Sequence, residues 1–86
     1  MNIMSEKSWR GKKIKVSYIL INTKPEKEYH VYNMLSNESK IIELKPLYRE
    51  FDLIAKVEID NTQKLGRFVT DKIKSLDGVI DTKTLQ

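Results

Sequence analysis

The sequence predicts an α+β domain whose strands and helices follow one another in the order β-α-β-β-α-β. Apolar residues recur with a period of two in four stretches and with helical spacing in two others. Short polar segments, some with proline or glycine, separate these stretches. With 86 residues and no cysteine, the chain is expected to form one small domain with a modest core and no disulfides.

The first strand is expected from about Ile14 to Asn22, a run rich in apolar and β-branched residues. Pro25 follows, and its missing N–H is tolerated in the first turn of a helix, so a helix is expected to begin there. Four residues at positions i, i+3, i+4 and i+7 form one face of this helix: Glu28, Val31, Tyr32 and Leu35.

Two strands, from Ile41 to Tyr48 and from Phe51 to Ile59, are expected to pair as a hairpin closed by residues 48–50. Pro46 suits an edge strand, because proline has no N–H to donate to a neighbouring strand. Alternate residues of the second strand define a buried face: Phe51, Leu53, Ala55, Val57 and Ile59.

A second helix is expected to begin after residues 60–62, whose side chains can accept its first free N–H groups. Gly66 lies inside this helix and is expected to permit close packing. Asp77-Gly78 signals a turn, after which Val79 to Leu85 returns as the last strand. The helix carries one apolar stripe: Leu65, Phe68, Val69, Ile73 and Leu76.

Right-handed crossovers would place the first and third strands at the centre of a four-stranded antiparallel sheet, with both helices on one face. This is the ferredoxin-like arrangement, and it leaves the other face of the sheet open. We assign Ile19, Ile21 and Ile54 to the open face. An apolar open face predicts a homodimer that buries sheet against sheet through these three residues.

The net charge of +4 is unevenly distributed. Residues 1–15 hold five basic side chains and one acidic side chain, while the rest of the chain is balanced. We therefore divide the chain into a basic N-terminal arm (residues 1–13) and a folded domain (residues 14–86). The arm is either a solvated terminus or a contact for phosphates or an acidic partner. No apolar run approaches membrane-spanning length and no signal core is evident, so a cytoplasmic protein is expected.

The sequence gives little support to an enzyme, a metal site or a bound cofactor. His30 is the single histidine and lies on the first predicted helix, where a lone histidine is usually an ordinary surface residue. Carboxylates lack the clustered spacing of metal ligands. The open face of the third strand reads Asp52, Ile54, Lys56 and Glu58, without the aromatic platform of RNA-recognition modules, so direct nucleic-acid binding is not expected.

Two segments carry groups suited to a small-molecule ligand. In the hairpin, Arg49 can pair with a ligand carboxylate, and Asp52 or Glu50 with an amine. In the last strand, three residues offer hydrogen-bonding groups: Asp81, Thr82 and Thr84. The alternative is that the hairpin residues are solvated charges of a turn.

The segment Leu47–Val57 (LYREFDLIAKV), together with Gly78–Thr84 (GVIDTKT), resembles the ligand-binding domain of the Lrp/AsnC family of transcriptional regulators. The resemblance covers about Val16 to Leu85. It implies dimers formed through the sheets, rings of dimers such as octamers, and amino-acid ligands between neighbouring dimers near the hairpin turn. The ligand-binding residues that it implies are Leu47, Tyr48, Arg49, Asp52, Asp81, Thr82 and Thr84.

Regulators of this family carry a helix-turn-helix before this domain, whereas about a dozen residues precede the first strand here. A stand-alone domain with no DNA-binding domain of its own is therefore expected, acting by its own assembly or with a full-length regulator. The family commonly has glycine where this chain has Arg49. Two interpretations follow: an amino-acid-sensing module in which Arg49 binds a carboxylate, or an assembly module in which Arg49 fills the pocket.

Overall fold

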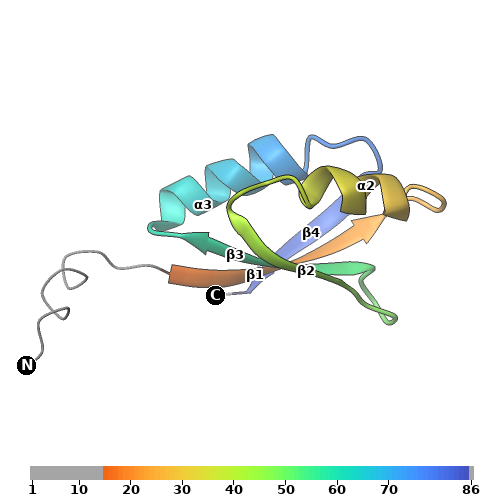
Figure 1. Cartoon of the computed structure of the whole chain (residues 1–86), viewed down its shortest axis with the longest axis horizontal. Coiled ribbons are helices and arrows are strands. Elements are labelled where there is room, and N and C mark those ends of the chain that lie inside the picture. Colours follow the sequence, from red (N-terminus) through yellow and green to blue (C-terminus); the bar gives the residue numbers. More distant parts are fainter. Residues whose placement is uncertain (1–14, 86) are drawn as a thin grey trace, which may run out of the picture.

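The computed structural model describes residues 15–85 and has the predicted order of elements (Figure 1). The N-terminal arm and the expected first residue of the first strand, Ile14, lie outside the described residues. The strands and helices are β1 (Lys15–Thr23), α2 (Glu28–Leu35), β2 (Ile41–Pro46), β3 (Leu53–Ile59), α3 (Thr62–Phe68), the π-helical turn η1 (Val69–Ile73) that continues α3, and β4 (Val79–Leu85).

The four strands form one antiparallel sheet in the order β2-β3-β1-β4. The first and third strands are central, as the crossover argument predicts, and β2 with its Pro46 is an edge strand. Figure 1 shows α2 and α3 together on one face of the sheet, which is the ferredoxin-like arrangement. No helix within residues 15–85 is long and apolar enough to span a membrane.

The core lies between this face of the sheet and the helices. The predicted apolar stripes are confirmed, because α2 buries Val31 and Leu35 while α3 and η1 bury four residues of the second stripe. From β3, alternate residues complete the core: Leu53, Ala55, Val57 and Ile59. Burial of these side chains is the main stabilising contribution to a domain of this size.

The assignment of Ile19 and Ile21 to the open face is wrong. Both side chains are 0% exposed and belong to the core beneath the helices. Ile19 pairs with Ala55 and Ile21 with Leu53, and directly paired residues of antiparallel strands point to the same face. The pattern of β1 could not settle this point, because the residues at its even positions are also apolar or aromatic.

Ile54 is on the open face, as assigned, where it pairs with Leu20. The same face of β1 carries Val16 and Tyr18, which are 41% and 39% exposed. Tyr18 also pairs with Leu85 of β4. The open face therefore has an apolar centre, formed by different β1 residues from those assigned to it.

The start of the first predicted helix differs from the structure. Helix α2 begins at Glu28, not at Pro25, because Lys27 donates its backbone N–H to the carbonyl of Lys24 (3.0 Å) and closes a turn. Pro25 and Glu26 are the central residues of this turn, and Glu26 has a positive φ of 72°. That combination is typical of a type II turn, in which proline favours the first central position.

The loop between η1 and β4 packs closely on α2. Gly78 has a φ of +105°, and a Cβ atom there would lie 2.8 Å from the Cβ of Lys27. The Gly78 carbonyl accepts the backbone N–H of Lys24 (2.8 Å), and Lys27 Nζ donates to Asp77 Oδ2 (2.8 Å). This hydrogen bond, together with the positive charge of Lys27, lowers the pKa of Asp77 below its ordinary value.

Gly66 does not have the predicted packing role. A Cβ atom at this position would meet no other atom within 4 Å, so no neighbouring element approaches the glycine. The N-terminus of α3 follows the prediction, because Asn61 Oδ1 accepts the backbone N–H of Lys64 (2.7 Å) and caps the helix.

Candidate functional site

The connection between β2 and β3 borders a hollow at one end of the sheet, which we call the hairpin hollow. Its volume is about 600 Å³, within the range typical of small-molecule sites. The connection comprises residues 47–52, longer than the predicted three, and the backbone N–H of Leu47 donates to the Asp52 carbonyl (2.8 Å) to close it. The lining residues are Leu20, Leu47, Arg49, Glu50 and Phe51.

The hairpin hollow combines opposite charges with apolar surface. Arg49 and Glu50 are exposed, and neither forms an ion pair within residues 15–85. Leu20 and Phe51 are partly buried beside them. A guanidinium can bind a carboxylate through two hydrogen bonds, and a carboxylate can accept from an ammonium group. The lining therefore offers partners for both charged groups of an amino acid and for an apolar side chain.

Asp52 holds the hairpin to β1. Its Oδ2 accepts the backbone N–H of Thr23 (2.8 Å) and the Thr23 hydroxyl (3.1 Å). Its own backbone N–H donates to the Ile21 carbonyl (2.9 Å). The Asp52 side chain thus has a structural role that the sequence did not indicate, and it is absent from the lining of the hairpin hollow.

Tyr48 does not line the hairpin hollow, and its side chain is 87% exposed. The predicted residues of β4 lie two strands away from β3 in the sheet order. Asp81 pairs with Asn22 at the end of β1 that Asp52 also contacts. Thr82 and Thr84 pair with Ile21 and Ile19, and so they lie on the helix side of the sheet.

One chain therefore brings together two of the seven predicted ligand-binding residues, Leu47 and Arg49, in a single hollow. Sequence reasoning did not assign Leu20 or Phe51 to the site, whereas it named Glu50 as a possible partner of a ligand amine. The alternation in β1 could have identified Leu20. If Ile19 and Ile21 are placed on the buried face, Leu20 between them lies on the open face, next to the hairpin hollow. Phe51 was expected in the core as the first residue of a strand, but β3 begins only at Leu53.

The described residues contain no group of three histidine, cysteine, aspartate or glutamate side chains that could hold a metal ion. His30 lies on α2 and is exposed, which agrees with its interpretation as an ordinary surface residue.

The sequence matches the Lrp/AsnC ligand-binding domain over residues 16–85, nearly the whole described part of the chain. The chain belongs to the Lrp/AsnC ligand-binding domain family. This result confirms the resemblance carried by the hairpin and the last strand. No curated protein has a significant match to this sequence.

Several solved structures are similar to this chain. The protein FFRP-DM1 is 34% identical, with a TM-score of 0.77 over 81% of this chain and 93% of that chain. A hypothetical protein from Pyrococcus horikoshii is 33% identical, with a TM-score of 0.75 over 84% and 86%. A transcriptional regulator from Neisseria meningitidis, solved as an L-Met complex, is 15% identical, with a TM-score of 0.76 over 98% and 55%. At that identity, the Neisseria likeness shows the fold alone.

The Lrp/AsnC domain is a regulatory ligand-binding domain of transcriptional regulators, and its family is not one of enzymes. In this chain, the hairpin hollow combines charged and apolar groups next to the open face of the sheet.

Proposed function

We propose that this chain is a regulatory module that binds an amino acid, or a related zwitterionic metabolite, in the hairpin hollow. The observation that carries the proposal is the lining itself, in which Arg49 and Glu50 lie beside Leu20 and Phe51. Arg49 binds the ligand carboxylate, Glu50 binds its ammonium group, and the apolar residues contact its side chain. The L-Met complex of the Neisseria regulator, which has the same fold, supports this class of ligand.

The proposed module works as an oligomer. Leu20 lines the hairpin hollow and also belongs to the open face, where it pairs with Ile54. A second copy that covers the open face would therefore border the hollow and shield the ligand from water. Ligand binding would then change the stability or the size of the assembly, a homodimer or a higher oligomer such as an octamer. Four of the predicted ligand-binding residues do not line the hairpin hollow of their own chain: Tyr48, Asp81, Thr82 and Thr84. In an oligomer, they would contact the ligand held by a neighbouring chain.

A second candidate function is an assembly module that binds no ligand and co-assembles with a full-length regulator. Two observations favour it. Arg49 stands where the family commonly has glycine, and its larger side chain lines the hairpin hollow. Asp52, the carboxylate expected to bind an amine, already accepts two hydrogen bonds from Thr23.

Thermal unfolding in the presence of each free amino acid distinguishes the two functions. A ligand that binds only the folded state raises the free energy of unfolding, by about 2.7 kcal/mol at a hundredfold excess over Kd. We expect at least one amino acid to raise the melting temperature of the wild type and to have little effect on Arg49→Gln. Arg67→Gln is the matched control, because Arg67 is the other arginine of residues 15–85 and lies outside the hairpin hollow. A wild type unaffected by every amino acid would favour the assembly module.

A further inference from the structure

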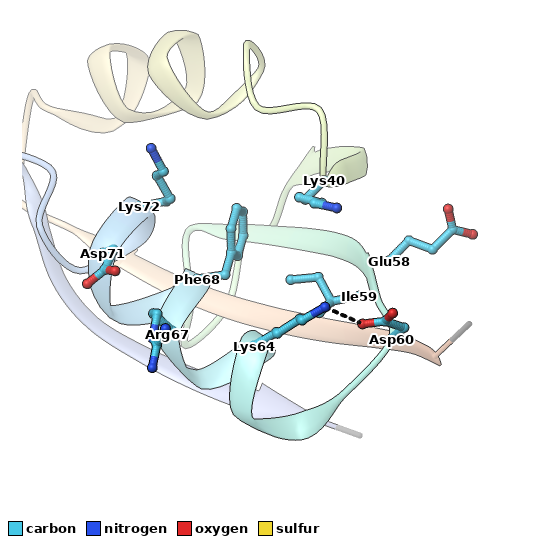
Figure 2. A pocket seen from close by; sticks show the side chains of 9 residues that line it. All are labelled: Lys40, Glu58, Ile59, Asp60, Lys64, Arg67, Phe68, Asp71 and Lys72. Atoms are coloured by element: carbon cyan, nitrogen blue, oxygen red, sulfur yellow. Dashed lines mark ion pairs between the residues drawn. The ribbon is translucent and has the colours of Figure 1, made fainter. Parts of the chain in front are cut away.

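A second hollow lies on the helix side of the molecule, at the opposite end of β3 from the hairpin (Figure 2). Its volume is about 500 Å³, and we call it the helix-side hollow. β3 rises by about 3.3 Å per residue over Leu53–Ile59, so its two ends are about 20 Å apart. The lining residues are Lys40, Glu58, Ile59, Asp60, Lys64, Arg67, Phe68, Asp71 and Lys72.

Two lysines flank an aromatic ring in this hollow. Figure 2 shows the Phe68 ring between the side chains of Lys40 and Lys72. Phe68 is 9% exposed and Ile59 is 8% exposed, so the floor beneath the lysines is apolar and mostly buried. The side chains of Lys40 and Lys72 are exposed above this floor, so both can reach an anion that enters the hollow.

The carboxylates of the lining do not neutralise these two lysines. Within residues 15–85 the ion pair of this hollow is Lys64 with Asp60, at 3.6 Å, and neither Lys40 nor Lys72 forms one. In Figure 2, Glu58 and Asp71 extend away from the Phe68 ring. Lys40 and Lys72 are therefore available to pair with an anion.

The backbone fixes the positions of both lysines. The carbonyl of Lys40 accepts the backbone N–H of Glu58 (3.0 Å), which holds the start of β2 against the end of β3. Lys72 lies in η1, where the backbone N–H of Lys74 donates to the carbonyl five residues earlier, at Val69 (2.8 Å). This π-helical turn forms the C-terminal end of the second helix and sets the position of Lys72 relative to Phe68.

We propose that the helix-side hollow binds a small organic polyanion, such as a phosphate ester or a polycarboxylic acid, between Lys40 and Lys72. The two ammonium groups bind the anionic oxygens, and the apolar floor of Phe68 and Ile59 contacts the carbon skeleton. This site does not depend on the hairpin hollow, because the two share no lining residue. It would give the domain a second ligand of a different chemical class.

The test is an NMR titration of the full chain with phenyl phosphate and, separately, with citrate, at about 50 mM salt, where charge attraction is only partly screened. Phenyl phosphate represents the phosphate esters and citrate the polycarboxylic acids. We expect saturable shifts of the backbone amide signals near Lys40, Phe68 and Lys72, with the signals of residues 47–52 unchanged. A preference for one probe would identify the source.

Two double variants with the same change of charge make the titration decisive. Lys40→Gln with Lys72→Gln should weaken binding by about tenfold or more, because both charge-assisted contacts are lost. Lys24→Gln with Lys74→Gln removes two exposed lysines outside the lining and should change the affinity by less than about twofold. Equal weakening by both variants, or shifts that spread over all lysines without saturation, would overturn the proposal.

Discussion

Thr23 and Asp52 are joined by two hydrogen bonds that end on the same carboxylate oxygen, one from the backbone N–H of Thr23 and one from its hydroxyl. Thr23 is the last residue of β1, and Asp52 directly precedes β3. Thr23 is 8% exposed, so its N–H has little access to water. The contact positions the hairpin, and with it Arg49 and Glu50, relative to the central strand of the sheet.

Replacing Asp52 by alanine should destabilise the domain. The change leaves a buried N–H without its acceptor, which costs about 1–3 kcal/mol. Thr23→Val removes only the hydroxyl bond and should cost about 1 kcal/mol or less. Urea unfolding of both variants measures the two costs, and an Asp52→Ala variant as stable as the wild type would show that the contact does not hold the hairpin.

Gly78→Ala should lower the free energy of unfolding by more than about 1 kcal/mol. The added Cβ would lie within 3.0 Å of atoms of Lys27 and Val31, at a φ that side chains rarely adopt. Gly66→Ala is the matched control, because it lies in α3 with no atom near the added Cβ. It should stabilise the domain by about 0.5–1 kcal/mol, since alanine has the higher helix propensity. Chemical denaturation measures both, and the same sign for both changes would contradict the packing described here.

The contribution of Asp77 to stability should depend on pH. Lys27 lowers the pKa of Asp77 in the folded state, chiefly through their hydrogen bond and then through its charge, from the ordinary value of 3.8. Protons therefore bind more readily to the unfolded state, so the contribution is fully present above the unfolded-state pKa and is lost as pH falls through the lowered folded-state pKa.

Unfolding experiments from about pH 6 to about pH 2.5 should show the stability difference between the wild type and Asp77→Asn shrinking in the acid range. The side chains of Lys27 and Asp77 are 44% and 63% exposed, so the effect should also weaken in salt. A difference independent of pH would show that the ion pair does not form in solution.

A charge on the open face should prevent dimerisation. Ile54→Glu places a carboxylate at the apolar centre of that face, where burial in an interface would desolvate it. We expect this variant to be monomeric at micromolar concentration in analytical ultracentrifugation. Tyr29→Glu is the control, because Tyr29 is 76% exposed on α2, on the opposite side of the sheet. Equal dissociation of both variants, or of neither, would argue against an interface through the sheet.

Most of the fold was predictable because local patterns agree with the final topology. The alternation in β3 and the apolar spacing of α2 and α3 each left one choice of buried face, and the structure has those faces. In β1 apolar residues occur at both even and odd positions, so its orientation depended on the pairing of Ile19 with Ala55, which no local pattern reveals.

The candidate site was less predictable, because it depends on contacts between distant segments. Arg49 and Leu47 could be identified from the charges and position of the hairpin. The bonds from Thr23 to Asp52 join residues 29 positions apart, and the place of Leu20 in the hollow follows from the register of β1 and β3. The positions of Thr82 and Thr84 on the helix side likewise follow from the register of β1 and β4.

The central claim is that an amino acid binds in the hairpin hollow and acts on the assembly. Light-scattering chromatography of the purified chain, with and without a mixture of the free amino acids, tests it most directly. We predict a dimer or larger ring whose size changes in the presence of the mixture, a change that Arg49→Gln reduces. A stable monomer at micromolar concentration under both conditions would contradict the claim.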